Sequence, residues 1–309
     1  MTDLPTRADF ESAAQRLHGQ IRRTPLLEVH GAELDVACRV LLKLELTQHT
    51  GAFKARGALN ALLTLDPDVS GVVAASGGNH GAAIAWAAGI VGIPADVFVP
   101  STSPEEKAAR IRGYGARTHI VDGYYPEALA ASRDWAADRP VAQVHAYNDR
   151  AVACGAGTLG LEIAEQAPDA RTVIVPCGGG GLYSGAALAL RGRADVLPVE
   201  PLNCPNLRAA LDAGEPVVVP VSGVAADSLG AEKTGDLAFA AAREFGTKPA
   251  MVSDEQIVAA RQWLWQRCRV LAEPGGAAAL AGLMSGGVTV RAGEAVVVVI
   301  SGGNNPTIP

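Results

Sequence analysis

Short apolar runs rich in β-branched residues alternate with alanine-rich stretches from about residue 71 to the end of this 309-residue chain. Such runs suit strands that are buried on both faces, and the alanine-rich stretches suit helices that cross over between parallel strands. The repeated strand–helix order therefore predicts an α/β fold in which helices cover both faces of mostly parallel sheets.

The alternation also predicts where individual elements lie. Thr158 is a plausible N-cap for one helix, because its hydroxyl can accept a hydrogen bond from an amide of the first turn. No internal repeat and no low-complexity linker divides the chain into autonomous halves. The expected strands are 71–76, 95–99, 118–121, 141–145, 172–176, 196–200 and 295–301, and the expected helices are 81–88, 104–114, 126–138, 158–166, 182–190, 256–268 and 276–283.

Composition narrows the classes of partner. Apolar residues make up 49% of the chain and charged residues 19%, with a net charge of −6, so no basic field attracts nucleic acid or anionic lipid. Glycine, proline and charge interrupt every apolar run, which argues against a membrane span. The cysteines form no close pair, so we expect buried free thiols in a reducing cytoplasm. They are Cys38, Cys154, Cys177, Cys204 and Cys268.

Four consecutive glycines, at 178–181, follow the strand predicted at 172–176 and precede a predicted helix. Without Cβ atoms, the backbone N–H groups can close around an anion at the positive end of a helix. The spacing matches neither the Walker pattern nor the dinucleotide fingerprint. A tight turn needs only one or two glycines, so the four together predict a site for a phosphate ester smaller than a nucleotide.

One lysine, Lys54, lies beside Phe53 in the segment 50–58, which is otherwise rich in small residues. Partial desolvation there would disfavour the ammonium form and leave the amine free to form a Schiff base. Most lysines are solvated surface charges, so this segment alone does not identify a reactive amine. Its combination with the glycine loop favours one.

Two more glycine-containing loops, 76–81 and 301–304, follow predicted strands. The first opens a helix, and a helix amino terminus with serine and asparagine side chains suits an anion such as an amino-acid carboxylate. His80 alone is more typical of a structural histidine than of a catalyst. Because open α/β sheets bind ligands at the carboxyl ends of strands, we expect these loops and the glycine loop to converge.

Together these segments resemble the fold-type II pyridoxal-phosphate (PLP) enzymes, which are tryptophan synthase β-like, and specifically the serine/threonine dehydratase branch with threonine ammonia-lyase and serine racemase. The ordered set is far more specific than any one motif. The resemblance implies two three-layer α/β domains, a large PLP-binding domain of residues 1–65 and 149–309 and a small domain of residues 66–148. The matching segments are 51–58, 76–81, 155–158, 178–182, 273–277 and 301–304.

The resemblance implies a role for each position around the cofactor. Lys54 would hold PLP as a Schiff base and then act as the base at the substrate Cα. Phe53 would pack on the pyridine ring, Asn79 would hydrogen-bond the 3′-oxygen and Ser301 would face the ring nitrogen. The residues that would hold the phosphate are Gly178, Gly179, Gly180, Gly181 and, through its amide, Leu182.

The substrate side of the site follows the same resemblance. Ser76, Asn79 and His80 would lie along the loop that receives the substrate carboxylate, and Asp227 is a candidate for the side-chain pocket. In the racemases of this family, a serine directly before the Gly-Asn-His of this loop protonates the second face of Cα. The corresponding residue here is Gly77, so we expect dehydration without efficient racemisation.

A cation site is also implied by the racemase-like members. The matching positions are Glu200, the backbone oxygen of Cys204, and Asn206. Asparagine keeps an oxygen ligand but lacks the charge of the family's aspartate, which weakens binding of a hard divalent cation. An empty site, a monovalent cation and an ordinary strand-end carboxylate at Glu200 are the alternatives.

The predicted function is PLP-dependent dehydration and deamination of L-threonine, L-serine or both to a 2-oxo acid and ammonia, by a cytoplasmic homodimer that binds neither nucleic acid nor membrane. The alternatives are another β-hydroxy amino acid such as threo-3-hydroxyaspartate, a serine racemase, and a PLP-binding protein without turnover. Only a short peptide follows Asn304, so we expect no carboxy-terminal regulatory domain and no inhibition by isoleucine.

Overall fold

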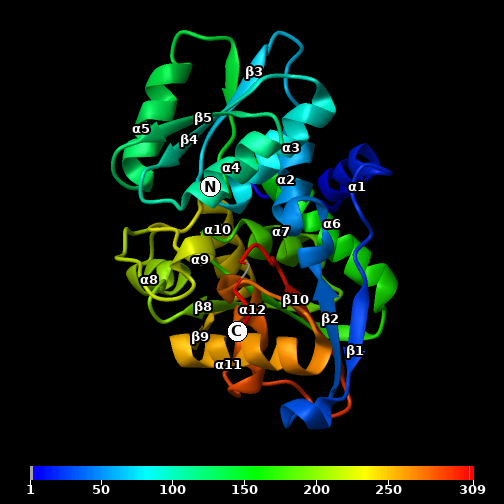
Figure 1. The fold of residues 1–309 in the computed structure, drawn as a ribbon. Coiled ribbons are helices and arrows are strands. Elements are labelled where there is room, and N and C mark those ends of the chain that lie inside the picture. Colours follow the sequence, from blue (N-terminus) through cyan, green and yellow to red (C-terminus); the bar gives the residue numbers. More distant parts are fainter. Residues whose placement is uncertain (1–2, 306) are drawn as a thin grey trace.

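The computed structural model describes residues 3–305 and 307–309 and contains two β-sheets with helices on both faces (Figure 1), which confirms the predicted α/β class. In the larger, six-stranded sheet one edge pair is antiparallel and the other strands are parallel. In spatial order its strands are β1 (Leu26–Val29), β2 (Arg39–Leu44), β10 (Ala295–Ile300), β7 (Ala170–Pro176), β8 (Asp195–Pro201) and β9 (Ala250–Val252).

The four-stranded sheet, drawn above the larger one in Figure 1, is parallel throughout. All of its strands come from residues 71–143, inside the segment expected to form the small domain. The division of the chain into domains at residues 65 and 148 stays a prediction. In spatial order these strands are β5 (Arg117–Val121), β4 (Ala95–Pro100), β3 (Gly71–Ala75) and β6 (Val141–Gln143).

Strand β10 shows how the larger sheet supports two cores. Alternate side chains of a strand point to opposite faces, so Val297 and Val299 enter one core while Val296 and Val298 enter the other. The first core is covered by α1 (Arg7–Leu17), α6 (Arg150–Gln166), α7 (Gly181–Ala189), α8 (Asn206–Ala213) and α10 (Asp236–Phe245). The second is covered by α9 (Ala226–Leu229), α11 (Asp254–Trp263) and α12 (Pro274–Met284).

The smaller sheet is covered in the same way. On one face, Val72 and Val97 pack against α2 (Lys54–Leu62), α3 (Asn79–Val91) and α4 (Glu105–Gly113). On the other, Val73 and Phe98 pack against α5 (Tyr125–Ala136). Short 3₁₀ helices η1 (Gly31–Leu34), η2 (Glu45–Thr47) and η3 (His49–Gly51) complete the amino-terminal part.

The predicted N-cap at Thr158 is wrong. Helix α6 begins eight residues earlier, at Arg150, because Asp149 caps it by accepting a hydrogen bond from Val152 N (2.9 Å). Thr158 lies inside the helix and donates to the carbonyl of Gly155 (2.7 Å). A Cβ on Gly155 would lie 2.8 Å from Gly57 Cα, so this glycine permits close packing of α6 on α2.

Two other expectations need correction. The helix predicted at 256–268 ends as an α-helix at Trp263 and continues as the π-helical segment η4 (Leu264–Cys268). All five cysteines are free, as expected, but Cys268 is partly exposed whereas the other four are buried. Among the residues described, no helix combines the length and apolar character that crossing a membrane requires.

Candidate active site at the carboxyl ends of the strands

A cavity of about 280 Å³ lies where the carboxyl ends of β3, β4 and β7 meet helix α9. It brings together side chains that the sequence scatters over more than 170 residues, including Lys54 and Asp227. The expected convergence of loops is therefore confirmed for 76–81 and the glycine loop. The lining includes Lys54, Ser76, Gly77, Gly78, Asn79, His80, Ser103, Tyr125, Ala146, Tyr147, Gly179, Asp227 and Ser228.

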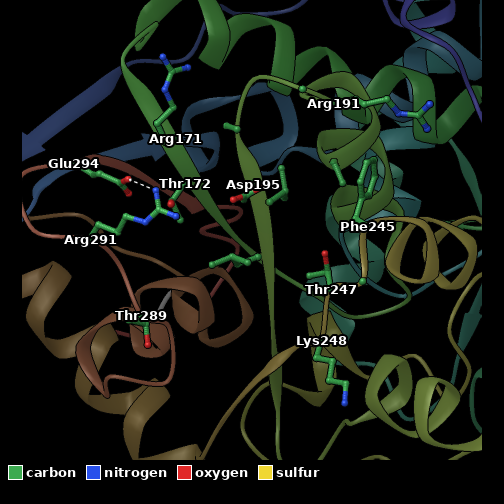
Figure 2. A pocket seen from close by; sticks show the side chains of 16 residues that line it. Arg171, Thr172, Arg191, Asp195, Phe245, Thr247, Lys248, Thr289, Arg291 and Glu294 are labelled. Carbon is green, nitrogen blue, oxygen red and sulfur yellow. Dashed lines mark ion pairs between the residues drawn. The ribbon is translucent and has the colours of Figure 1, made fainter.

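A larger cavity of about 520 Å³ opens at the opposite end of the six-stranded sheet (Figure 2). It is lined by residues at the amino ends of strands, such as Arg171 of β7 and Asp195 of β8, and by none of the predicted site residues. Two of its arginines are already in ion pairs: Arg191 with Glu244 at 2.8 Å, and Arg291 with Glu294 at 3.5 Å. Size alone would therefore select the wrong cavity.

Lys54 is the first residue of α2, and its amine reaches across to the segment that follows β6. Nζ donates to the carbonyl of Ala146 (2.9 Å) and lies 5.0 Å from the centre of the Phe53 ring. Burial lowers the pKa of Lys54 to about 8, and the charge of Glu273 opposes this shift only in part. About a tenth of the amine is therefore neutral at pH 7, far more than for a solvated lysine, and a nucleophile or base needs this neutral form.

The glycine loop crowds its neighbours so closely that side chains are excluded. Gly180 has φ +87°, the left-handed region, and a Cβ there would fall inside the side chain of Ala238. A Cβ on Gly178 would lie 2.9 Å from Leu229 Cα, and one on Gly179 would penetrate the Tyr147 ring. The four glycines thus lie closely packed at the amino terminus of α7, where the helix dipole favours an anion. The remaining two phosphate candidates lie in the first turn of α7: Gly181 and Leu182.

Asn79 belongs to a polar network that joins three loops. Its Nδ2 donates to Glu273 Oε1 (2.7 Å), and its Oδ1 accepts from Asn304 Nδ2 (2.7 Å). Asn304 N also donates to Glu273 Oε2 (3.2 Å). The loop at 301–304 therefore reaches the site through Asn304, while Ser301 is buried behind it, its carbonyl accepting from Phe53 N (3.0 Å).

Glu273 belongs to one of the matching segments, but no role was predicted for it from the sequence. The carboxyl is 5% exposed, and burial raises its pKa despite the two asparagine donors. Contacts over such sequence separations leave no local signal, so the motif at 273–277 was the one available indication.

The loop after β3 is held by its own side chains. Ser76 Oγ accepts from Gly78 N (3.1 Å), and His80 Nε2 lies 3.0 Å from the carbonyl of Val144. Burial lowers the pKa of His80 to about 3, and the nearby charge of Lys54 contributes to this shift, so the imidazole is neutral at physiological pH. A carboxylate here would meet the amino terminus of α3 and neutral side chains, not a histidinium.

Asp227 lines the cavity from α9 and forms an ion pair with Lys107 of α4. Among the described residues, this is the one ion pair that links the 66–148 segment to the rest of the chain. Two tyrosines complete the wall: Tyr125, and Tyr147, whose hydroxyl donates to the carbonyl of Lys233 (3.0 Å).

The predicted cation ligands lie together at the end of β8 but outside the cavity. Both carboxylate oxygens of Glu200 accept amides of the first turn of α8, from Leu207 (2.7 Å) and Arg208 (2.9 Å), so this carboxylate caps a helix. Asn206 Nδ2 donates to Ala231 O (2.9 Å), while its buried Oδ1 has no hydrogen-bond partner within the described part of the chain. Cys204, which lies between these two residues in the sequence, is also buried. No group of three or more His, Cys, Asp or Glu side chains suited to a metal occurs in residues 3–305 and 307–309.

Comparisons with known proteins agree with this geometry. An L-threonine ammonia-lyase from Geobacter sulfurreducens is 36% identical over 300 residues, which cover 96% of this chain and 74% of that protein. The solved structure of a threonine deaminase from T.th. matches with a TM-score of 0.91 and 33% identity, covering 99% of this chain and 100% of that one. Maize serine racemase matches with a TM-score of 0.92 and 31% identity, covering 98% and 94%.

A family model described as pyridoxal-phosphate dependent enzyme matches residues 17–302, which include every residue predicted from the sequence to bind cofactor or substrate. This match and the relatives agree with the geometry of the cavity, in which a lysine of lowered pKa lies with Gly179 of the glycine loop. The chain belongs to the pyridoxal-phosphate dependent enzyme family.

Proposed function

We propose that this chain is a PLP-dependent ammonia-lyase that dehydrates and deaminates L-threonine, L-serine or both to 2-oxo acid and ammonia. The observation that carries the proposal is that Lys54, with a pKa of about 8, shares one cavity with Gly179 of the anion loop. Relatives named L-threonine ammonia-lyase at 36% identity support the reaction class.

The residues present fit the cofactor. The four glycines lie at the amino terminus of α7, and neighbouring atoms leave no room for a Cβ on Gly178, Gly179 or Gly180. Close to them, the hydroxyls of Thr234 and Ser228 are buried without a hydrogen-bond partner among the described residues. Thr234 Oγ1 lies 3.6 Å from the position of a Cβ on Gly180, so it is available to a phosphate held there. When bound, PLP would withdraw electrons from the substrate Cα and so acidify its C–H bond.

Each residue then has a physical task. The Lys54 amine takes the Cα proton, because burial keeps part of it neutral. Phe53 and Asn79 would hold the ring, and Ser301 would offer its nitrogen a neutral hydroxyl. A neutral partner does not enforce a protonated ring, which favours elimination of a β-substituent over a long-lived carbanion. Water is lost across Cα–Cβ, and the product hydrolyses to 2-oxo acid and ammonia.

The substrate carboxylate is assigned to the amino terminus of α3, within reach of Ser76, Asn79 and His80. The first amides of a helix lack intrahelical partners and carry partial positive charge. Because its pKa is about 3, His80 would bind the carboxylate as a neutral ring and not as a cation.

Asp227 bears on the choice among hydroxy amino acids. It places a carboxylate on the cavity wall, and the nearest cation, Lys107, is already paired with it. A second carboxylate on the substrate, as in 3-hydroxyaspartate, would meet a like charge. The site therefore favours the neutral side chains of serine and threonine. Racemisation is the weaker alternative, because residue 77 itself has no proton donor and the hydroxyl beside it, that of Ser103, is assigned below to the substrate carboxylate.

We also propose a cytoplasmic homodimer and, at Glu200, Cys204 and Asn206, a cation site of low charge. Five free cysteines favour a reducing compartment.

Two observations support the cation site. The buried Oδ1 of Asn206 lacks a partner among the described residues. Burial raises the pKa of Glu200 to about 8 although two amides bind it, so a positive charge beside this carboxylate would stabilise it. Light scattering and activity with and without chelator, potassium or magnesium would test the two proposals.

The function is tested by incubating the PLP-loaded protein with L-serine, L-threonine and both 3-hydroxyaspartate diastereomers, and measuring 2-oxo acid, ammonia and D-serine. We expect equal amounts of 2-oxo acid and ammonia from threonine or serine, and little D-serine. Cofactor uptake with no product from any substrate would indicate a PLP-binding protein without turnover. D-serine formed as fast as pyruvate would favour the racemase.

A further inference from the structure

Gly77 lacks a side chain in the loop assigned to the substrate carboxylate, yet the space beside it is filled. A Cβ built on Gly77 would fall on the hydroxyl oxygen of Ser103 and lie 2.8 Å from Ser103 Cβ. Its φ lies outside the left-handed region, so the backbone itself would accept any L-residue. What excludes a side chain at position 77 is therefore the side chain of Ser103.

The topology explains how two distant residues share this place. Strands β3 and β4 are parallel neighbours, with Ala75 opposite Phe98, and their carboxyl ends face the cavity together. Ser103 lies in the turn after β4, where its N–H donates to the carbonyl of Pro100 (2.9 Å). Both Gly77 and Ser103 line the cavity that also holds Lys54.

We propose that Ser103 is a substrate-binding residue, whose hydroxyl donates a hydrogen bond to the substrate carboxylate from the position that a side chain at residue 77 would otherwise occupy. The inference rests on the proposed function in so far as it places the carboxylate at the amino terminus of α3. A hydroxyl beside unpaired helix amides adds a donor on the same side as the helix dipole. The side chain of Ser103 is half-buried, so a carboxylate would reach its hydroxyl without repacking.

The test moves the hydroxyl from one loop to the other. Ser103→Ala removes it, Gly77→Ser adds one against Ser103, and Gly77→Ser/Ser103→Ala transplants it. We expect Ser103→Ala to raise KM for L-threonine about tenfold with a smaller change in kcat, because a hydrogen bond to a charged group is lost. The double variant should return KM to within about threefold of the parent, a result that a merely structural role of Ser103 would not produce.

Two measurements do not depend on turnover. Ser103→Ala should weaken binding of L-alanine, which has a carboxylate but no β-hydroxyl, about tenfold by calorimetry on the PLP-loaded protein. Gly77→Ser should lower the unfolding midpoint, and Ser103→Ala in the same chain should restore most of it, since it removes the hydroxyl on which the new Cβ falls. Ser101→Ala is the matched control, because Ser101 Oγ accepts from Gly123 N (3.2 Å) outside the cavity lining.

Unchanged L-alanine binding in Ser103→Ala, or a double variant no better than Ser103→Ala alone, would overturn the inference. If the parent protein has no dehydratase activity, the proposed function fails instead, while L-alanine binding and the unfolding midpoints still decide the position and role of Ser103.

Discussion

Two cations only two residues apart on helix α2 have opposite environments. Lys54 opens the helix and offers its amine to one carbonyl, that of Ala146, at the edge of the cavity. Arg56 is fully buried and is held by two carboxylates: Nη2 lies 2.7 Å from Glu45 Oε1 and 2.9 Å from Glu162 Oε2. The same short helix therefore carries one cation without a directly bound carboxylate and one with two.

The pKa values respond accordingly. Burial lowers the pKa of Lys54 to about 8. Burial would lower that of Arg56 as well, but the charges of Glu45 and Glu162 outweigh it and raise the pKa. A further buried cation, Lys43, also pairs with Glu162 at 2.6 Å. Burial still lowers the pKa of Lys43, but Arg56 and Lys43 each bind a carboxylate directly, whereas the Lys54 amine binds only a carbonyl.

The largest expected effect is on chemistry, at Lys54. Lys54→Ala removes the only base assigned at Cα, so kcat should fall on the order of 10³-fold or more. The unfolding midpoint should stay the same or rise, because a poorly solvated amine is lost. Steady-state kinetics of the PLP-loaded proteins and thermal unfolding of the apoproteins check the two, because loss of bound cofactor would itself lower the midpoint. A variant with a tenth of the parent kcat would contradict the role of Lys54.

The next effect is on folding, at Arg56. Arg56→Met leaves Glu45 buried without its cation, and the free energy of unfolding should fall by about 3–5 kcal/mol. Arg23→Ala is the matched control, because the Arg23–Glu165 pair (2.7 Å) is exposed and its loss should cost about 1 kcal/mol or less. Denaturant unfolding measures both. An equal loss of free energy of unfolding in the two variants would show that the buried ion pairs stabilise the fold no more than the exposed one.

A smaller effect concerns pH. Only the neutral amine of Lys54 can react with an aldehyde, so PLP uptake by the apoprotein should rise about tenfold per pH unit up to about pH 8 and then level off. Glu273→Gln removes a charge that raises this pKa, so levelling should begin at lower pH. Stopped-flow absorbance follows the uptake. A rate that climbs until the ordinary lysine value of 10.5 would show a solvated amine.

The smallest effect is expected at the Lys107–Asp227 pair, in which the carboxylate is exposed and the lysine largely buried. Asp227→Asn keeps the shape of the side chain but loses the charge, and KM for threonine should rise about threefold. The loss should shrink as salt is added, because screening weakens the pair in the parent. Lys107→Met should have the same effect, and the double variant little more. Fully additive losses would show that the two residues act separately.

Most strands beyond residue 71 followed from the sequence, because they are continuous apolar runs such as 295–300, but β9 and helices α8, α9 and α10 were not predicted. The amino-terminal elements were not predicted. Helix α2 contains Arg56 and Asn60, which are both fully buried. No pattern in the neighbouring sequence indicates that Glu45 and Glu162 neutralise the arginine. Such an element forms because of tertiary pairing and not because of an apolar pattern.

The candidate site divides in the same way. Loops that follow strands were predicted to converge, because parallel topology fixes where carboxyl ends meet. Side-chain contacts across loops were not predictable: Asn79 bonds to Glu273 and Asn304, which lie 194 and 225 residues away. Gly77 is a further example, because the space beside it is filled by Ser103, a residue that belongs to none of the sequence motifs.

The most direct test of the central claim is to reduce the PLP-loaded protein with borohydride, digest it and locate the modified residue by mass spectrometry. The chain has five lysines, and the account predicts that the phosphopyridoxyl group is found on Lys54 alone. Modification of Lys43, Lys107, Lys233 or Lys248 in its place, or no modification of any lysine, would contradict it.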